Sequence, residues 1–375
     1  MKTSFLIFLT LFLYSHKKIS GQNKFSKLND TIVIKTKIQK GDGLFQLGAA
    51  PLALINASEK PNNNFFKYPN NIQNIKHTES LSSDFVDIMT GTNNGRNIFI
   101  IDENGNKDFS DDKIQSTKKI LWSKNDKPIK YNHKTNTKGY SWFRMGLVRD
   151  DFYFGRSEHL IGEFTIDNKS FTIHIADPMN ALGSSYNIDP ILALIKNQNI
   201  VKDSISNRDL LKLGEYLNLN GAYYKFNNIS KNGEFITLIK EKNFNNKIGT
   251  QVGMIAPSFE AVSTSGDTIN NNKLSNKITL VANSCGCGGD KKSTQAYYDI
   301  KKNYKDLNVI HVDSKIDTEL DGIHIDTENS FNKDFYENYR KQYCSRIVYV
   351  IGKDNRIIDK FEITDWKPIL QKTHK

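Results

Sequence analysis

The sequence predicts a chain of two domains, an antiparallel β-rich domain over residues 22–245 and an α/β domain over residues 246–375. The first observation is length, because 375 residues exceed what one hydrophobic core usually serves. The second is a change of pattern near residue 245, where alternating β segments give way to strands that alternate with helices. A stretch rich in Asn and Lys, residues 243–250, is predicted to be the linker between them.

Residues 1–21 look like a secretory signal peptide. Lys2 precedes an apolar run over residues 5–14, and the small residues Ser20 and Gly21 follow it. The run is shorter than the roughly 20 apolar residues that a bilayer span needs, and no other segment approaches that length. We therefore expect an exported protein, periplasmic or extracellular, without a membrane span in the mature chain. A retained N-terminal anchor is the alternative.

Composition narrows the classes of function. The chain is 38% hydrophobic and 25% charged, which is typical of a globular protein. Its net charge of +11 comes mostly from lysines scattered among asparagines, without a continuous basic run. This distribution indicates solvated faces, so we expect no nucleic-acid partner. The 3 cysteines are too few for a disulfide-stapled scaffold.

The first region is predicted to be an antiparallel sheet or sandwich. Segments enriched in β-branched and aromatic residues, most alternating at period two, predict strands at residues 31–36, 97–101, 163–167, 169–175, 223–226 and 234–239. The turns at Asp167-Asn168 and at residues 230–233 predict hairpins. Helical signals are sparse, chiefly residues 190–196 and 207–216.

The second region has an α/β pattern. Apolar and helical segments predict the order strand, helix, strand, helix, hairpin, helix at residues 278–282, from 290, 309–312, from 330, 347–361 and 366–371. Asp290 is a plausible N-cap of the first helix, whose buried face is predicted to carry Ala296, Tyr297, Ile300 and Tyr304. The second helix is predicted to place Phe331, Phe335, Tyr336 and Tyr339 on one side.

Two cysteines lie where the first of these strands turns into the first helix. Cys285 and Cys287 belong to the segment Asn283-Ser-Cys-Gly-Cys-Gly-Gly-Asp290. A thiolate at a helix N-terminus faces unsatisfied N–H groups and the positive end of the helix dipole. Its pKa falls, and more of it is nucleophilic at neutral pH. The sequence therefore predicts thiol chemistry at this turn.

The second region resembles the redoxin and thioredoxin-like family, which includes periplasmic thiol-disulfide oxidoreductases and thiol peroxidases. The resemblance covers roughly the last third of the chain and is carried by residues 252–259, Gly266-Asp267, 277–281 with the cysteine turn, and the hairpin 350–357. It implies a thioredoxin fold with Cys285 or Cys287 in the place of the nucleophilic cysteine.

The departures from the family lie at the site. The usual Trp-Cys-x-x-Cys is replaced by Cys285-Gly286-Cys287, and a disulfide across this shorter spacing would be strained and more oxidising. Arg346 stands where the family has its cis-proline, and an arginine there resembles peroxiredoxins, in which it steadies the peroxidatic thiolate. Ser284 fits their Thr/Ser-x-x-Cys signature, but its preceding proline is replaced by Leu280.

Cys344 lies two residues before Arg346 and is expected to approach the cysteine turn if the alignment holds. Three roles stay open for it. The first is a resolving thiol that pairs with either turn cysteine. The second is a ligand that binds a soft metal together with both turn cysteines and His311 or His324. The third is a buried, inert thiol.

A second candidate site follows the strand at residues 97–101. Oxygen-bearing side chains recur mostly at alternate positions, as in calcium loops: Asp102, Asn104, Asn106, Asp108, Asp111 and Asp112. The glycine at the fourth position and Lys113 at the twelfth exclude an EF-hand loop. The alternatives are a calcium site and a plain Asx-rich turn.

The expected function is thiol-disulfide exchange by an exported protein. Cys285 attacks a substrate disulfide as thiolate, Cys287 resolves the mixed disulfide, and Lys291 helps to lower the thiol pKa. The expected partners are protein thiols or disulfides, and no cofactor is required. A thiol peroxidase supported by Arg346 and a non-catalytic thioredoxin-like binding module are the alternatives.

Overall fold

The computed structural model describes most of the chain between residues 30 and 373. The described ranges are 30–45, 47–59, 65–79, 85–116, 129–132, 140–148, 151–178, 183, 185–195, 205–284, 290–313, 322–340 and 345–373. The predicted signal peptide and the three cysteines, Cys285, Cys287 and Cys344, lie outside the described residues.

The largest sheet has eight strands and is antiparallel. Its order is β14-β13-β12-β11-β1-β17-β16-β15. The strands are β1 (Thr31–Lys40), β11 (Glu158–Ile166), β12 (Lys169–Ala176), β13 (Ile191–Ile195), β14 (Leu210–Lys212), β15 (Tyr216–Leu219), β16 (Ala222–Ile229) and β17 (Phe235–Glu241). The strand-rich, antiparallel character predicted for the first region is confirmed.

This sheet has to curl because its two outermost strands are consecutive in the chain. In a flat eight-stranded sheet the outer strands would lie about 34 Å apart. The chain from Lys212 to Tyr216, which joins β14 to β15, reaches at most about 14 Å. The curl encloses an apolar core from every part of the sheet, including Ile34, Leu160, Ile173, Leu217, Phe226 and Leu238.

The turns and helices of this region were predicted with unequal success. Asp167 and Asn168 both have positive φ, 48° and 61°, as a two-residue hairpin between β11 and β12 requires. The helices predicted at residues 190–196 and 207–216 are wrong. Residues 191–195 form β13, held between β12 and β14, while residues 207–209 form the short 3-10 helix η2 (Asn207–Asp209) before β14. Pairing with neighbouring strands outweighs the local helical signal.

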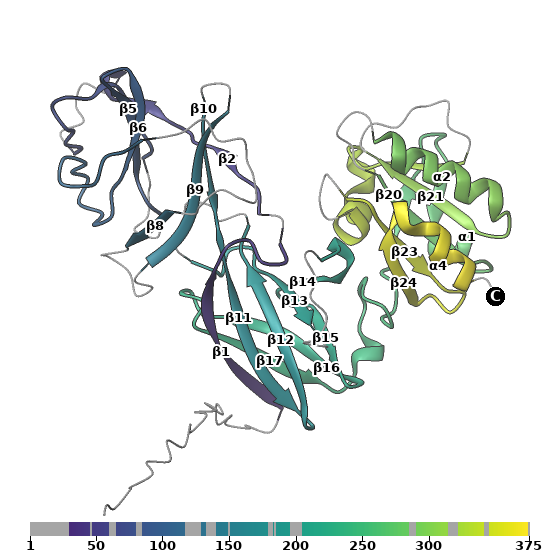
Figure 1. Cartoon of the computed structure of the whole chain (residues 1–375). Helices are drawn as coiled ribbons and strands as arrows, with labels where there is room; N and C mark the ends of the chain where they lie inside the picture. The colour runs from purple at the N-terminus through teal and green to yellow at the C-terminus, as the bar shows by residue number, and fades with distance from the viewer. Residues whose placement is uncertain are drawn as a thin grey trace, which may run out of the picture.

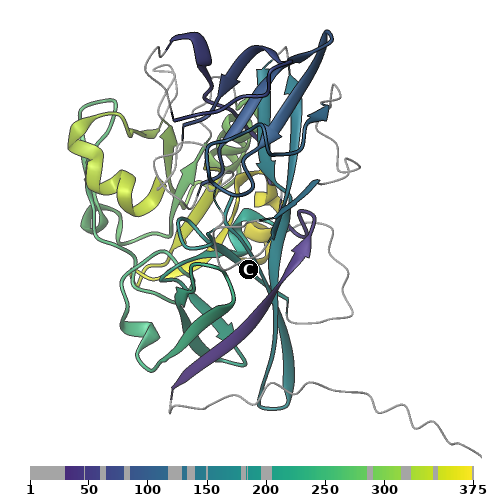
Figure 2. The ribbon, with the colours of Figure 1, turned by 90° about the vertical axis from the view of Figure 1, so that its left-hand side faces the viewer.

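Two smaller sheets lie above the curled sheet in Figure 1 and Figure 2. One has the order β3-β4-β5-β6-β7 and the other β2-β10-β9-β8. Their elements are β2 (Ala50–Pro51), β3 (Ile55–Asn56), η1 (Ala57–Glu59), β4 (Gln73–His77), β5 (Ile88–Asn93), β6 (Arg96–Ile101), β7 (Gln115–Ser116), β8 (Ile129–Asn132), β9 (Tyr140–Val148) and β10 (Asp151–Arg156). Ile88 and Phe99 from one sheet pack against Phe143 and Phe154 from the other.

The C-terminal part contains a five-stranded sheet of order β22-β21-β20-β23-β24. Its strands are β20 (Thr279–Asn283), β21 (Asn308–Asp313), β22 (Ile323–Asp326), β23 (Ile347–Ile351) and β24 (Ile357–Glu362). The first three strands are parallel to one another, and β23 is antiparallel to both β20 and β24. The predicted strands and helices occur in the predicted order, but the structure adds β22, which the sequence analysis did not predict, between β21 and the second helical segment. Parallel strands joined through a helix are what an α/β layer requires.

Helices cover both faces of this sheet. Helix α2 (Lys291–Asn303) and helix α4 (Trp366–Thr373) pack on one face through Tyr297, Ile300 and Leu370. The other face meets the irregular segment formed by η4 (Ser330–Asn332), α3 (Lys333–Phe335) and the π-helix η5 (Tyr336–Arg340). Phe335 and Tyr339 are buried there as predicted, whereas Phe331 is 78% exposed and does not share their side.

The predicted linker, residues 243–250, is packed against its surroundings. It contains η3 (Phe244–Asn246), and the Phe244 ring stacks on Tyr223 with 3.6 Å between centroids. Arg356, between β23 and β24, donates to the carbonyl of Asn245 at 2.5 Å. The chain then forms β18 (Glu260–Val262), β19 (Thr268–Asn270) and α1 (Asn271–Leu274) before it enters β20. None of the helices in the described ranges has the length and apolar character to cross a bilayer.

Candidate functional site

The candidate site is the connection between β20 and α2, at the C-terminal edge of the parallel strands. Ser284, which follows β20, is 0% exposed, and α2 begins at Lys291. Cys285 and Cys287 are part of the five residues between Ser284 and Asp290, and the structure describes both ends of this connection but not the cysteines themselves. The residues that flank the cysteines therefore form the predicted arrangement, with strand β20 before them and helix α2 after them.

Asp290 caps the helix as predicted. Its carboxylate accepts from the backbone N–H of Ser293 at 3.3 Å and from the Ser293 hydroxyl at 2.5 Å. An anionic cap stabilises the helix, but its charge works against a second anion, such as a thiolate, at the same terminus. The negative charge of Asp290 therefore opposes ionisation of a thiol in the cysteine turn.

Arg346 lies at the same helix terminus. Its Nε is 2.6 Å from Oδ2 of Asp290, and its side chain is 51% exposed. The ion pair offsets the negative charge of the cap. The sequence placed Arg346 beside the thiols, and the structure brings its guanidinium to the carboxylate that begins α2. Lys291, also proposed to lower the thiol pKa, is exposed on the first turn of α2.

Sequence reasoning missed a buried polar chain behind the turn. The Ser284 hydroxyl lies 2.8 Å from Nε2 of His311, and Nδ1 of His311 lies 3.2 Å from Nδ1 of His324. Both imidazoles are nearly inaccessible to solvent. The Tyr297 ring from α2 stacks on His311 with 4.6 Å between centroids. Each contact in this chain needs one donor and one acceptor, so the tautomer of His311 is tied to that of His324.

The two histidines meet because their strands pair in register. His311 on β21 is the partner of His324 on β22, and Ala282 on β20 is the other partner of His311. The sequence does carry a signal, since Ile310-His-Val-Asp313 and Ile323-His-Ile-Asp326 repeat one pattern. Burial is the largest cause that lowers the pKa of His311, from 6.5 to about 3, and the neighbouring His324 and Arg340 lower it further. His311 is therefore neutral at physiological pH.

Arg340 was also missed, and it is the largest fully buried side chain near the turn. It is 1% exposed, and its Nη1 donates to the carbonyl oxygens of Ser284 at 2.9 Å and Val312 at 3.1 Å. These carbonyls close the ends of β20 and β21, and the first belongs to the peptide bond that joins Ser284 to Cys285. Arg340 thus places a guanidinium directly behind the cysteine turn and fixes the direction in which the chain enters it.

Asn283 holds the same strand end from the side of η5. Its Nδ2 donates to the carbonyl oxygens of Tyr339 at 3.1 Å and Ile347 at 2.8 Å. The residue is fully buried, so these bonds hold β20, β23 and the irregular segment together at one point. Ser345, the described residue next to Cys344, is likewise buried.

The predicted calcium loop forms a compact turn after β6. One oxygen of Asp102 accepts from the N–H groups of Gly105 and Asn106, and the other accepts from that of Lys107. The remaining predicted ligands bond within the turn: the Asn104 and Asn106 amides donate to Asp111, the Asp108 carboxylate accepts from Ser110, and Asp112 accepts from the N–H of Glu103. In the described residues, no three His, Cys, Asp or Glu side chains gather as a metal site would require.

Comparison with known proteins finds structural similarity for the C-terminal part. No protein-family profile matches the chain. No curated protein sequence matches it either. Among solved structures, the chain is similar over about a third of its length to thioredoxin-like thiol-disulfide oxidoreductases and to a thiol peroxidase.

Three of these structures illustrate the similarity. The thioredoxin domain of a thiol-disulfide oxidoreductase from Bacteroides vulgatus has 14% identity and a TM-score of 0.27, over 33% of this chain and 99% of its own. The thiol peroxidase from Chromobacterium violaceum has 14% identity and a TM-score of 0.28, over 34% of this chain and 91% of its own. A thiol:disulfide interchange protein from Bacteroides sp. has 14% identity and a TM-score of 0.26, over 33% and 91%.

Proposed function

We propose that the C-terminal α/β part performs thiol-disulfide exchange through Cys285 and Cys287. The observation that carries this proposal is the setting of the two cysteines between a fully buried strand end, Ser284, and the capped N-terminus of the 13-residue helix α2. A helix of this length presents its free N–H groups and dipole to the preceding turn, where they stabilise an anion. A thiolate is the anion that the sequence supplies there.

The exchange proceeds in two balanced steps. The Cys285 thiolate attacks one sulfur of a substrate disulfide, so a mixed disulfide forms and the other substrate sulfur leaves as a thiolate that takes up a proton. The Cys287 thiolate then attacks the Cys285 sulfur and releases the second substrate sulfur. The substrate gains two electrons, and the protein is left with a Cys285–Cys287 disulfide. The reverse sequence oxidises a substrate dithiol.

Two cations support the attacking thiolate. The Arg340 guanidinium, buried behind Ser284, adds a positive charge where solvent screens it little. Arg346 acts differently, because it neutralises the Asp290 carboxylate that would otherwise oppose a thiolate at the same helix end. Both effects lower the pKa of a thiol in the turn, and the buried one is expected to be larger.

The proposal is tested with insulin as substrate and dithiothreitol as electron donor. The protein is expected to accelerate precipitation of the insulin B chain over the uncatalysed rate. Cys285→Ser abolishes the acceleration, while Cys287→Ser accumulates a mixed disulfide with the substrate that non-reducing electrophoresis resolves. Cys344→Ser is the matched control, and its rate reports whether a third thiol takes part.

Two other outcomes correspond to the alternative functions. Rapid consumption of hydrogen peroxide that Arg346→Gln slows, without insulin reduction, would identify a thiol peroxidase. Absence of both activities in a folded, reduced protein would leave a non-catalytic thioredoxin-like binding module. Equal rates for the protein and its Cys285→Ser variant would contradict the proposed exchange.

The proposed partners and location follow from the same chemistry. Protein thiols and disulfides are the expected partners, and export is expected from residues 1–21. Fractionation of expressing cells, with mass determination of the secreted chain, measures both the location and the cleavage site. Retention of the full-length chain in the membrane fraction would support an N-terminal anchor instead.

A further inference from the structure

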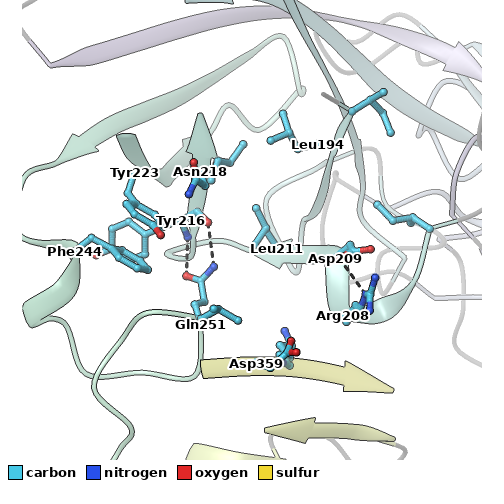
Figure 3. A pocket seen from close by; sticks show the side chains of 15 residues that line it. Leu194, Arg208, Asp209, Leu211, Tyr216, Asn218, Tyr223, Phe244, Gln251 and Asp359 are labelled. Carbon is cyan, nitrogen blue, oxygen red and sulfur yellow. Dashed lines mark hydrogen bonds and ion pairs between the residues drawn. The ribbon is translucent and has the colours of Figure 1, made fainter. Parts of the chain in front are cut away.

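A cavity lies at the open seam of the curled sheet, between its outermost strands β14 and β15 (Figure 3). It holds about 640 Å³ and is bounded by β14 on one side, β15 on the other, and Asp359 and Lys360 of β24 below. Its walls combine aliphatic side chains with the rings of Tyr216, Tyr223 and Phe244. The cavity has no role in the exchange mechanism described above.

The main chain of β15 turns its hydrogen-bonding groups toward this seam at alternate residues. The β15–β16 hairpin closes through Asn220 and Gly221, whose φ values of 56° and 85° define a two-residue turn flanked by the pair Leu219–Ala222. In such a hairpin that closing pair exchanges hydrogen bonds, and bonded pairs then alternate with unbonded ones. Leu219 and Leu217 therefore bond to β16, whereas the N–H and C=O groups of Asn218 and Tyr216 face outward.

A side chain already occupies one of these two positions in the manner of a peptide. The Tyr216 N–H donates to Oε1 of Gln251 at 2.8 Å, and Nε2 of Gln251 donates to the Tyr216 carbonyl at 3.0 Å. The Gln251 carboxamide thus supplies the donor and acceptor that the peptide group of an added strand would supply. Figure 3 shows both bonds at the edge of β15.

The next outward position, Asn218, lines the cavity beyond Gln251. The Asn218 side chain accepts from the N–H of Gly221 at 2.9 Å and so belongs to the hairpin turn. In the described part of the chain, β15 is the last strand of the sheet and none pairs with its outer side. The seam therefore offers main-chain hydrogen bonds beside an apolar wall, which is how a sheet edge binds an extended peptide.

We propose that the seam between β14 and β15 binds an extended segment of an unfolded polypeptide, which pairs with β15 at Asn218. The inference rests on the proposed exchange activity, whose protein substrate would bind at the seam in an extended conformation. The charges support a polypeptide. Arg208 and Asp209 on one side, with Asp359 and Lys360 on the other, sum to zero, so the cavity has no excess charge for a polyphosphate or other multiply charged ligand.

The position of β24 connects this cavity with the cysteine turn. Lys360 borders the cavity, and three residues later the N–H of Ile363 donates to the carbonyl of Arg346 at 2.8 Å. Arg346 is the residue paired with the cap of α2. Three residues of a strand span about 10 Å, so a chain that leaves the seam along β24 reaches Arg346 and the N-terminus of α2 after a short distance.

The test uses fluorescein-labelled, reduced and S-carboxymethylated lactalbumin, an unfolded chain without free thiols, and measures fluorescence anisotropy with the full-length protein. Asn218→Pro removes the outward N–H without removing a bond of the sheet, because proline is tolerated on the open side of an edge strand. Asn218→Ala is its matched control, since it loses the same side-chain bond to Gly221 but keeps the N–H. We expect Asn218→Pro to weaken binding at least tenfold and Asn218→Ala to stay within about twofold.

A second pair of variants tests the cavity without altering the main chain of β15. Val252 lines the cavity at 47% exposure, and Val33 on β1 is 41% exposed and does not line it. Val252→Trp fills the space and is expected to weaken binding at least tenfold, whereas Val33→Trp leaves it unchanged. Binding that neither Asn218→Pro nor Val252→Trp weakens, or no binding by the unmodified protein, would overturn the inference.

The proposed exchange and the seam fail in distinguishable ways. Reduction of a small disulfide such as oxidised glutathione needs only the thiols, so its rate is expected to be equal in Val252→Trp and the unmodified protein. If the protein reduces disulfides but does not bind the unfolded chain, the proposed peptide binding at the seam is contradicted and the proposed exchange activity is not. Binding without exchange, in a protein whose thiols are reduced, would contradict the proposed function and leave the seam standing.

Discussion

The β-rich region and the α/β region both bury charged side chains, but they surround them differently. In the β-rich region the Glu158 carboxylate, 0% exposed, accepts from Tyr186 and from the N–H of Trp142, both at 2.9 Å. Arg156 faces the same carboxylate at 3.8 Å, and its Nη2 also donates to the carbonyl oxygen of Ser185 at 2.9 Å, so this guanidinium has both a charged and a main-chain acceptor. In the α/β region the guanidinium of Arg340 donates to main-chain carbonyls at two strand ends.

The difference indicates different uses of burial. Around Glu158 the carboxylate accepts from Tyr186 and Trp142 and faces Arg156, so the cluster joins β9, β10 and β11 and fixes how the curled sheet meets the smaller one. Burial and the adjacent Glu158 raise the pKa of Tyr186 well above its usual 10, so the phenol stays a donor. Arg340 instead directs its charge toward the peptide that precedes Cys285. We expect the first cluster to control stability and the second to control thiol reactivity as well.

Replacing Glu158 by Gln is expected to have the largest effect. The change leaves the Arg156 guanidinium buried without its carboxylate, which costs roughly 3–5 kcal/mol when one partner of a buried pair is lost. Urea unfolding followed by far-UV circular dichroism measures the loss. Glu163→Gln, at an exposed position of β11, is the control. If Glu158→Gln also changed the alkylation rate of the cysteines as strongly as Arg340→Met does, the two clusters would not differ in their effect on the thiols.

Replacing Arg340 by Met should lower stability by a comparable amount and alter the thiols more. Two charged hydrogen bonds are lost, and each contributes roughly 1.5–3 kcal/mol. The pKa of the reactive thiol is expected to rise, because a nearby positive charge is removed. The pH dependence of iodoacetamide alkylation measures this rise. Arg340→Lys keeps the charge, so it should restore the pKa even if stability remains reduced.

Acid is expected to destabilise the α/β region through His311. Its folded-state pKa of about 3 lies below the ordinary 6.5, so the unfolded state binds the proton more readily. The stabilisation is fully present above pH 6.5 and is lost as the pH falls toward 3, with a slope of up to about 1.4 kcal/mol per pH unit. Unfolding midpoints of the protein and of His311→Asn across this range measure it, and parallel curves would exclude His311 as the cause.

The turn that follows β6 gives a smaller effect in the β-rich region. Asp102→Ala removes the acceptor of three backbone N–H groups and is expected to cost about 1–2 kcal/mol, as loss of a capping side chain does. Because Asp102 is also the first predicted calcium ligand, the thermal midpoint is measured with EDTA and with millimolar calcium. If the loop is only a turn, Asp102→Ala is expected to lower the thermal midpoint by the same amount in EDTA and in calcium. A midpoint of the unmodified protein that rises with calcium would support the metal site.

The smallest effect on stability is expected for Arg346→Gln. The ion pair with Asp290 is half exposed, and pairs of this kind contribute at most about 1 kcal/mol. The thiol pKa should nevertheless rise, since the cap then keeps its full negative charge beside the turn. The pH dependence of alkylation in Arg346→Gln and in Arg340→Met shows which of the two cations lowers the thiol pKa more. A larger rise for Arg346→Gln would reverse the order proposed here.

Local patterns in the sequence determined the elements and the turn. Period-two alternation located most long strands of the curled sheet, and the apolar spacing of Ala296, Tyr297 and Ile300 located the buried face of α2. The place of Cys285 and Cys287 between a strand and a helix also follows from local residues. These features depend on a few neighbouring side chains, so a single sequence specifies them.

Tertiary structure decided which distant segments meet. Residues 191–195 became a strand because β12 and β14 lie on either side of them. Ser284, His311 and His324 became one polar chain because three strands pair in a given register, and the seam beside β15 exists because the sheet curls. Strand order and register are set by contacts between segments far apart in the chain, which no local period encodes.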